Sequence, residues 1–168
     1  MNVKLVLYNN ETETAIDLII KFWQAHNHHT PSREDALADL MDWTKEKHCL
    51  YLICHDEDYI GFVHLGSRGG KIDWLEDLFV LPELQGKGIG TYVISLVEDI
   101  VKEYSESLYI EAAARNRRAI RLYQRNGYTC LNTITIRKDF QPENFETIST
   151  EKIMDMDFEV KQYMGFDK

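Results

Sequence analysis

Six residues near the middle of the chain have the types and the spacing to bind an anion. They read Gln85-Gly86-Lys87-Gly88-Ile89-Gly90. Glycine permits a tight turn and lets a ligand come close to the backbone. Where a helix begins after such a turn, the N–H groups of its first turn have no partner within the helix and can point toward a phosphate. The segment therefore predicts a phosphate-binding turn.

The spacing of these glycines excludes two common phosphate-binding motifs. The P-loop pattern GxxxxGK[ST] does not occur in the chain, and the dinucleotide pattern GxGxxG fails because Gly90 comes one position early and is followed by Thr91. Residues 72–81 before the turn are largely apolar, as in a buried strand that Pro82 ends. Apolar residues recur at helical spacing from Ile89 to Ile100. The turn is thus expected between a strand and a helix.

Length and composition favour one globular domain without a membrane span. The chain has 168 residues, 44% of them hydrophobic, and no apolar run approaches the length of a membrane helix. The N-terminus lacks the basic and apolar regions of a secretory signal. Cys49, Cys54 and Cys130 show no CxxC spacing, so we expect reduced, partly buried thiols in a cytoplasmic protein.

Charge is distributed unevenly along the chain. The net charge is −9, which disfavours binding to nucleic acid or to anionic membranes. Residues 112–138 nevertheless hold seven basic side chains and no acidic one, so the rest of the chain carries −16. A basic region near a phosphate-binding turn suits a polyanionic cofactor, and the acidic remainder suits a cationic acceptor.

Hydrophobic periodicity predicts an alternation of strands and helices. Strands are expected at residues 3–8, 49–54, 59–65, 72–81, 107–113, 128–137 and 157–163; helices at 11–25, from Ser32 on, at 88–104 and at 116–127; and a polar loop at 139–150. Ser32 with Asp35 is an N-cap signature. His64 is expected as a hydrogen-bonded core histidine. The loop histidines His26, His28 and His29 match no common metal-ligand pattern, so no metal is expected.

Two motifs resemble signatures of the GNAT superfamily of N-acetyltransferases. The hexapeptide Gln85–Gly90, which follows EDLFVLPE, resembles the acetyl-CoA turn that this family writes [RQ]-x-x-G-x-[GA]. The segment NRRAIRLYQRNGY, from Asn116 to Tyr128, resembles a second family signature and starts 30 residues after Gly86. The resemblance covers residues 50–136; the flanking parts, which usually bind the acceptor in this family, match in arrangement only.

The resemblance implies an α/β (α+β) fold in a single GNAT-like domain over residues 1–168. Its sheet would be mixed and mostly antiparallel, with a splayed parallel strand pair at the centre and helices on both faces. The cofactor-binding core would span residues 72–128, and acceptor-side elements would come from 1–48 and 138–168. Apolar residues near Met154 to Tyr163 would offer an edge for a homodimer.

The resemblance also implies positions for acetyl-CoA, residue by residue. The pantetheine arm would pair with the backbone of Leu78, Phe79 and Val80. The diphosphate would lie on the amides of Gln85, Gly86, Lys87, Gly88, Ile89, Gly90 and Thr91. Asn116 would help to hold the cofactor arm, and Tyr123 would lie near its sulfur. Gln85 stands where the family often has arginine, which predicts weaker binding unless Lys87 or nearby arginines compensate.

Acetyl transfer to an amine defines what the remaining side chains must do. Deprotonating a primary amine at pH 7 costs about 4 kcal/mol. Glu76 and Asp77 are the candidate bases, with Glu76 preferred by its position in the strand; the alternative is that both only attract a cationic amine. Tyr123 is the candidate acid that protonates the departing thiolate. No cysteine nucleophile is expected, which favours direct transfer in a ternary complex.

These inferences lead to one function with two alternatives. We expect an N-acetyltransferase that uses acetyl-CoA and acts on a small cationic amine of the polyamine or aminoglycoside class. The alternatives are an enzyme that acetylates a protein or peptide amine, and a non-catalytic acyl-CoA-binding regulatory module on the same fold.

Overall fold

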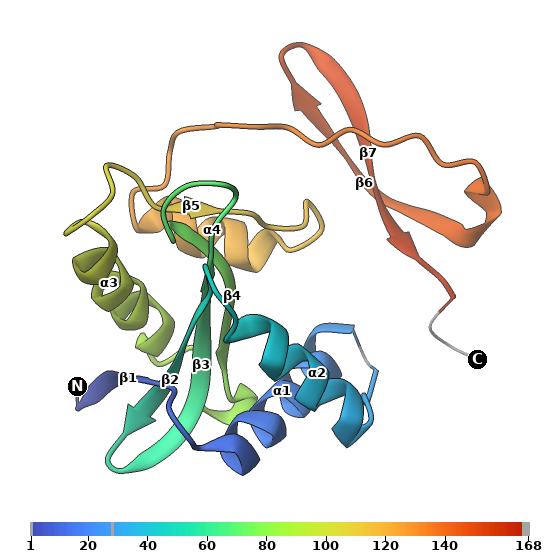
Figure 1. Ribbon diagram of the computed structural model, residues 1–168. Coiled ribbons are helices and arrows are strands. Elements are labelled where there is room, and N and C mark those ends of the chain that lie inside the picture. Colours follow the sequence, from blue (N-terminus) through green and yellow to red (C-terminus); the bar gives the residue numbers. More distant parts are fainter. Residues whose placement is uncertain (1, 28, 166–168) are drawn as a thin grey trace. The chain divides into compact units, whose positions relative to one another are not determined.

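The computed structural model describes residues 2–27 and 29–165 (Figure 1). They form two compact units, one up to Glu111 and one from Ala112 onward, and each is described by itself. The elements of the first unit are β1 (Val3–Leu7), α1 (Thr12–Asn27), α2 (Arg33–Trp43), β2 (Cys49–His55), β3 (Asp58–Gly66), β4 (Trp74–Val80), the 3-10 turn η1 (Pro82–Leu84), α3 (Ile89–Val101) and β5 (Tyr109–Ile110).

The first unit is built on a five-stranded mixed sheet in the order β1-β2-β3-β4-β5. The first four strands pair antiparallel, and β4 and β5 are parallel, joined through α3. This confirms the predicted α/β class with a mixed, mostly antiparallel sheet and one parallel pair. The parallel pair lies at the edge of the sheet and not at its centre, since residues 128–137 form no strand beyond β5.

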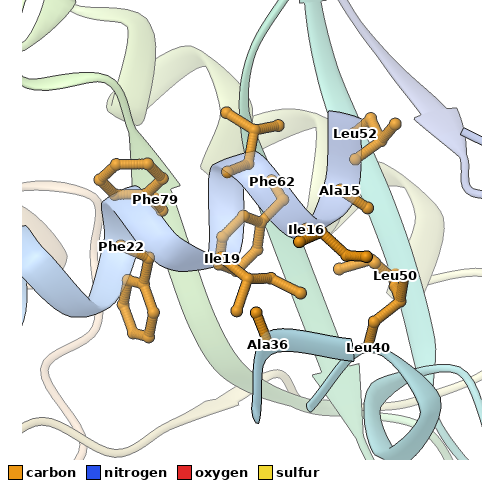
Figure 2. Packing of buried hydrophobic residues seen from close by; sticks show 11 residues of the cluster. Ala15, Ile16, Ile19, Phe22, Ala36, Leu40, Leu50, Leu52, Phe62 and Phe79 are labelled. Carbon is orange, nitrogen blue, oxygen red and sulfur yellow. The ribbon is translucent and has the colours of Figure 1, made fainter. Parts of the chain in front are cut away.

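One face of the sheet is covered by α1 and α2. Their apolar side chains pack on Leu50 and Leu52 of β2, Phe62 of β3 and Phe79 of β4 (Figure 2). The predicted N-cap of α2 is confirmed as a full capping box, because Ser32 Oγ accepts from the Asp35 N–H and the Asp35 carboxylate accepts from the Ser32 N–H. The core therefore fixes both helices against strands that lead toward the glycine turn.

Helix α3 lies on the other side of the sheet, away from α1 and α2 (Figure 1). Its buried residues are Ile89, Val93, Ile94, Val97 and Val101, so one apolar stripe fixes how the helix is rotated. Because this stripe starts at Ile89, directly after the last turn glycine with a positive φ angle, packing of α3 also fixes the glycine turn at its N-terminus. The prediction of helices on both faces is confirmed.

The second unit contains α4 (Arg117–Arg125), the 3-10 turn η2 (Pro142–Asn144) and a hairpin of β6 (Phe145–Ile153) and β7 (Met156–Tyr163). Two predictions are wrong here. Residues 128–137 form no strand, and Leu131 and Ile136 stay about two-thirds exposed (66% each), so their alternation has no core to bury it. The second wrong prediction is the loop at 139–150, because its second half belongs to β6, which gains its backbone hydrogen bonds by pairing with β7.

Three further findings concern the cysteines, the expected absence of a metal site and the membrane-spanning potential of the helices. Of the cysteines, Cys54 is buried and Cys49 half-buried, but Cys130 is exposed because its segment forms no strand. His28 lies outside the described residues, and within those residues no group of three or more His, Cys, Asp or Glu side chains could hold a metal ion. None of the described helices has the length and apolar character needed to cross a membrane.

Candidate functional site

The glycine turn adopts the conformation that its sequence suggested. After β4, the N–H groups of Leu84 and Gln85 donate to the carbonyls of Leu81 and Pro82, at 2.9 and 3.2 Å. Gly86 and Gly88 then have φ angles of 78° and 83°, in the left-handed region that favours glycine. Gly88 is the N-cap of α3, and it supplies no side-chain cap to the N–H groups of the first turn.

The surface of this turn is open. A Cβ atom built on Gly86 would meet no atom of the structure within 4 Å. Gln85 does not reach over the turn, because its Nε2 donates to the Val80 carbonyl at 2.8 Å and so ties the turn to the end of β4. Residues Gln85 to Thr91 are thus brought together at an open helix N-terminus, which has the backbone polarity to bind an anion.

The strand that leads into the turn has one largely unpaired edge. Strand β5 pairs with β4 only at Trp74 and Leu75. Beyond these positions, residues 76–80 have β3 on one side and, within the described chain, no strand on the other. Leu78, Phe79 and Val80 lie in this stretch, so their backbone edge can pair with an extended ligand.

A β-bulge marks the place where β4 leaves β5. His64 of β3 pairs with Asp77, and the next residue Leu65 pairs with Leu75, so Glu76 is the extra residue. The two candidate bases, Glu76 and Asp77, therefore sit at and beside the bulge. Their side chains have different partners, so the two carboxylates are suited to different roles.

Glu76 lies in a cluster of charged and aromatic side chains. Arg68 Nη2 is 3.2 Å from Glu76 Oε2, and Arg68 Nη1 is 2.6 Å from Glu111 Oε2. The Arg68 guanidinium also lies 3.7 Å from the centre of the Trp74 ring. Burial lowers the pKa of Arg68, but its hydrogen bonds to Glu76 and Glu111 outweigh burial and raise that pKa, so Arg68 stays a cation. Glu76 is accordingly part of a salt bridge.

Asp77 belongs to a hydrogen-bonded chain of three side chains. Asp77 Oδ2 is 2.9 Å from His64 Nδ1, and His64 Nε2 is 2.8 Å from His48 Nδ1. The His64 ring is 4% exposed and stacks on Trp43 with ring centres 4.9 Å apart. His64 is confirmed as a buried, hydrogen-bonded histidine. His48 was not predicted as a site residue. The signal for it is the pairing of β2 with β3, because His64 pairs with Leu50, two residues after His48.

Burial is the largest cause that lowers the pKa of His48. The neighbouring His64 and Lys45 lower it further, and Glu76 and Asp42 oppose them without reversing the shift. The net effect keeps the imidazole of His48 neutral at pH 7. A half-buried neutral imidazole whose Nε2 bonds to no other described residue is a group that can accept a proton.

Asn116 and Tyr123 belong to the second unit. Asn116 is the N-cap of α4, and its Oδ1 accepts from the Ala119 N–H at 3.1 Å. The Tyr123 ring packs edge-on against Tyr128, with ring centres 6.0 Å apart. Arg117 of α4 forms a salt bridge with Glu151 of β6. The proximity of Asn116 and Tyr123 to the glycine turn stays a prediction, because each unit is described by itself.

A parallel strand pair bonded at only two positions, with a glycine-lined helix N-terminus after its first strand, defines an α/β protein with an open turn. The pattern of the acetyltransferase (GNAT) family matches residues 13–128, well over half of the chain, and the chain belongs to this family.

Curated relatives cover part of the chain. The spermine/spermidine N(1)-acetyltransferase of Bacillus subtilis (strain 168) is 29% identical over 96 residues, which are 49% of this chain and 62% of that protein. The chain thus matches less than two thirds of that relative's length.

Solved structures of other acetyltransferases resemble this chain in fold over most of its length. The aminoglycoside N-acetyltransferase AAC(6')-Iy, in complex with the bisubstrate analogue CoA-S-monomethyl-acetylneamine, has a TM-score of 0.65 at 19% identity and covers 83% of this chain and 99% of its own. The ribosomal-protein-alanine N-acetyltransferase from Brucella melitensis biovar Abortus 2308 has a TM-score of 0.62 at 18% identity, with 81% and 99% covered. At these identities the likeness shows the fold alone.

Proposed function

We propose that this chain transfers the acetyl group of acetyl-CoA directly to a primary amine in a ternary complex. One observation carries the proposal: an open helix N-terminus with left-handed glycines directly follows a strand whose outer edge, from the bulge onward, pairs with no strand of the described residues. The first feature suits a diphosphate and the second suits an extended amide-containing arm. The cofactor of this family contains both groups.

The proposed position of acetyl-CoA uses these two features. Its diphosphate accepts hydrogen bonds from the amides of the turn after Gln85, since the Gln85 N–H already donates to Pro82. Its pantetheine arm pairs with the backbone of Leu78 to Val80, so that the thioester comes to the bulge beside Asp77. By the family resemblance, Asn116 helps to hold the cofactor arm and the Tyr123 hydroxyl serves its sulfur. When bound, the co-substrate supplies the activated acetyl thioester.

The residues of the chain then have separate tasks. A backbone N–H near Val80 stabilises the oxyanion that develops on the acetyl group, a contribution of about 10²–10³ in rate for a well-placed donor. Tyr123 gives its hydroxyl proton to the departing sulfur. Glu76, held in its salt bridge with Arg68, attracts the cationic acceptor. The group that takes the proton from the acceptor amine is proposed to lie on the same side of β4 as Asp77.

The proposed acceptor is a small cationic amine. The name of the Bacillus subtilis relative gives spermine and spermidine as substrates, and that protein matches this chain over 96 residues. The acidic residues outside the region 112–138 give the rest of this chain a charge of −16, which favours encounter with a polycation. Glu76 and Glu111 place two carboxylates around a single arginine at the splay, where an acceptor ammonium can replace part of that contact.

Thiol release from acetyl-CoA over a panel of amines tests the proposed function. The panel includes spermidine, an aminoglycoside, free lysine and a peptide with a free N-terminus. We expect the highest kcat/KM with spermidine or the aminoglycoside. Preference for the peptide would assign a protein amine as the acceptor instead. Tight binding of acetyl-CoA without turnover of any amine would contradict the enzyme and leave a binding module.

Glu76→Gln is expected to raise KM for spermidine about 5- to 10-fold, because a partly exposed charge contributes roughly 1 kcal/mol to attraction. The acid limb of kcat/KM should remain, and can only move to lower pH through the lost charge near His48, since the proposed role is attraction and not proton transfer. Glu103→Gln, which removes the same charge in the exposed turn after α3, is the matched control and should leave KM unchanged. Loss of the acid limb in Glu76→Gln would show that Glu76 is the base after all.

A further inference from the structure

The chain Asp77–His64–His48 connects the bulge of β4 to the surface. Asp77 lies beside the bulge, and His64 is buried on β3. His48 is half-buried and directly precedes the first residue of β2. Both links, at 2.9 and 2.8 Å, are of ordinary hydrogen-bond length. The chain is therefore continuous from a carboxylate in the proposed site to an imidazole that solvent can reach.

Stability does not account for this hydrogen-bonded chain of Asp77, His64 and His48. It is inserted at the rim of an aromatic cluster formed by Phe22, Trp43, Phe62 and Phe79. Burying a carboxylate and an imidazole there costs desolvation, and apolar side chains of similar volume often stabilise such a place equally well or better. Hydrogen-bonded titratable groups in such surroundings occur preferentially at functional sites.

The hydrogen bonds determine where the protons lie. A carboxylate only accepts, so His64 carries its proton on Nδ1 and donates it to Asp77. In this arrangement His64 accepts at Nε2, and His48 donates from Nδ1. The remaining nitrogen, His48 Nε2, keeps its lone pair.

We propose that His48 Nε2 is the base that takes the first proton from the acceptor ammonium, and that His64 and Asp77 position it and stabilise the imidazolium. The inference rests on the proposed function. One N–H bond of the ammonium breaks and a bond to His48 Nε2 forms, after which the amine lone pair forms the C–N bond as the C–S bond breaks. Tyr123 protonates the sulfur, and the second proton lost by the nitrogen restores the Tyr123 hydroxyl. His48 then releases its proton to solvent.

The surroundings of His48 fit this task. The groups that face it are His64 from β3, Lys45 and Asp42 from the end of α2 and the turn after it, and Glu76 from β4. His48 is linked to the bulge through His64, which bonds to Asp77 beside Glu76. Because burial, His64 and Lys45 lower the pKa of His48 below its ordinary value near 6.5, the base is neutral at pH 7 and loses its function only as the pH falls through that lower pKa.

The test is the pH dependence of kcat/KM between pH 5 and 9 with spermidine as acceptor. The wild type should lose activity on the acid side, with the limb at a pH below the ordinary imidazole value of about 6.5 because the pKa of His48 is lowered. His48→Gln should lower kcat/KM at pH 7.5 about 10²-fold and remove this acid limb. Asp77→Asn should move the limb to lower pH, since the imidazolium loses its counter-charge. His55→Gln removes a histidine at the far end of β2 and should reproduce the wild type.

Two outcomes separate this inference from the proposed function. If the wild type acetylates amines and His48→Gln keeps the full rate and the acid limb, the base assignment fails and the acetyltransferase stands. If the wild type acetylates no amine, both fail. Imidazole ¹H–¹⁵N spectra give a readout without turnover: neutral His48 should carry its proton on Nδ1, and a proton on Nε2 would overturn the proposed chain.

Discussion

Replacing Gly90 by glutamate is expected to weaken binding of CoA at least about 100-fold while the protein stays folded. Gly90 is the second residue of α3, and its φ angle is not in the left-handed region, so a side chain is compatible with its backbone. The added carboxylate occupies the anion site and repels the diphosphate. Loss of two charge-assisted hydrogen bonds alone corresponds to about 3 kcal/mol or more, which exceeds a 100-fold change in Kd.

The helix itself should tolerate this substitution. Glycine is a poor helix former, and an acidic side chain in the first turn is favourable for the helix dipole. Calorimetric titration with CoA measures the affinity, and thermal unfolding measures stability. Ser95→Glu adds the same charge on an exposed position of the same helix and should bind CoA as the wild type does. Equal weakening by both variants would mean that overall charge, and not the turn, controls binding.

Replacing Tyr123 by phenylalanine is expected to lower kcat about 10²-fold or more with little change in the Kd of acetyl-CoA. The proposed role of the hydroxyl is to protonate the departing thiolate, and a positioned acid contributes about 10²–10⁴ in rate. The ring, which packs on Tyr128, is kept in the variant. A loss confined to kcat is the pattern expected when an interaction exists only in the transition state.

Tyr128→Phe provides the matched control for this variant. It removes a hydroxyl from the other ring of the same aromatic pair, and Tyr128 has no part in the proposed chemistry. Its kcat should stay within about twofold of the wild type, as for a change that removes no transition-state contact. A Tyr123→Phe enzyme with the wild-type kcat at every pH would exclude Tyr123 as the acid.

Local patterns in the sequence predicted the parts of the fold that depend on neighbouring residues. The capping box of Ser32 and Asp35 and the glycine turn from Gly86 to Gly90 depend on contacts a few residues apart. The buried face of α3 follows from helical periodicity. Each of these features can be read from a short stretch of sequence, because backbone geometry alone links the residues involved.

Features that depend on distant partners could not be predicted in the same way. The alternating residues 128–137 have the pattern of a strand but form none, whereas polar β6 is a strand because β7 pairs with it. Likewise, His48 is positioned by a hydrogen bond to His64, 16 residues away, and Glu76 forms its salt bridge with Arg68 of the loop between β3 and β4. Periodicity says nothing about such side-chain partners.

The central claim is that backbone amides of the turn between β4 and α3 bind the diphosphate of CoA. Amide ¹H–¹⁵N spectra recorded during titration with CoA, and with pantetheine as the matched ligand without a diphosphate, test it most directly. CoA should shift the amide signals of Gly86, Gly88, Ile89 and Gly90, and pantetheine should leave them in place. Binding of CoA that leaves these four signals unmoved, or no binding at all, would contradict the claim.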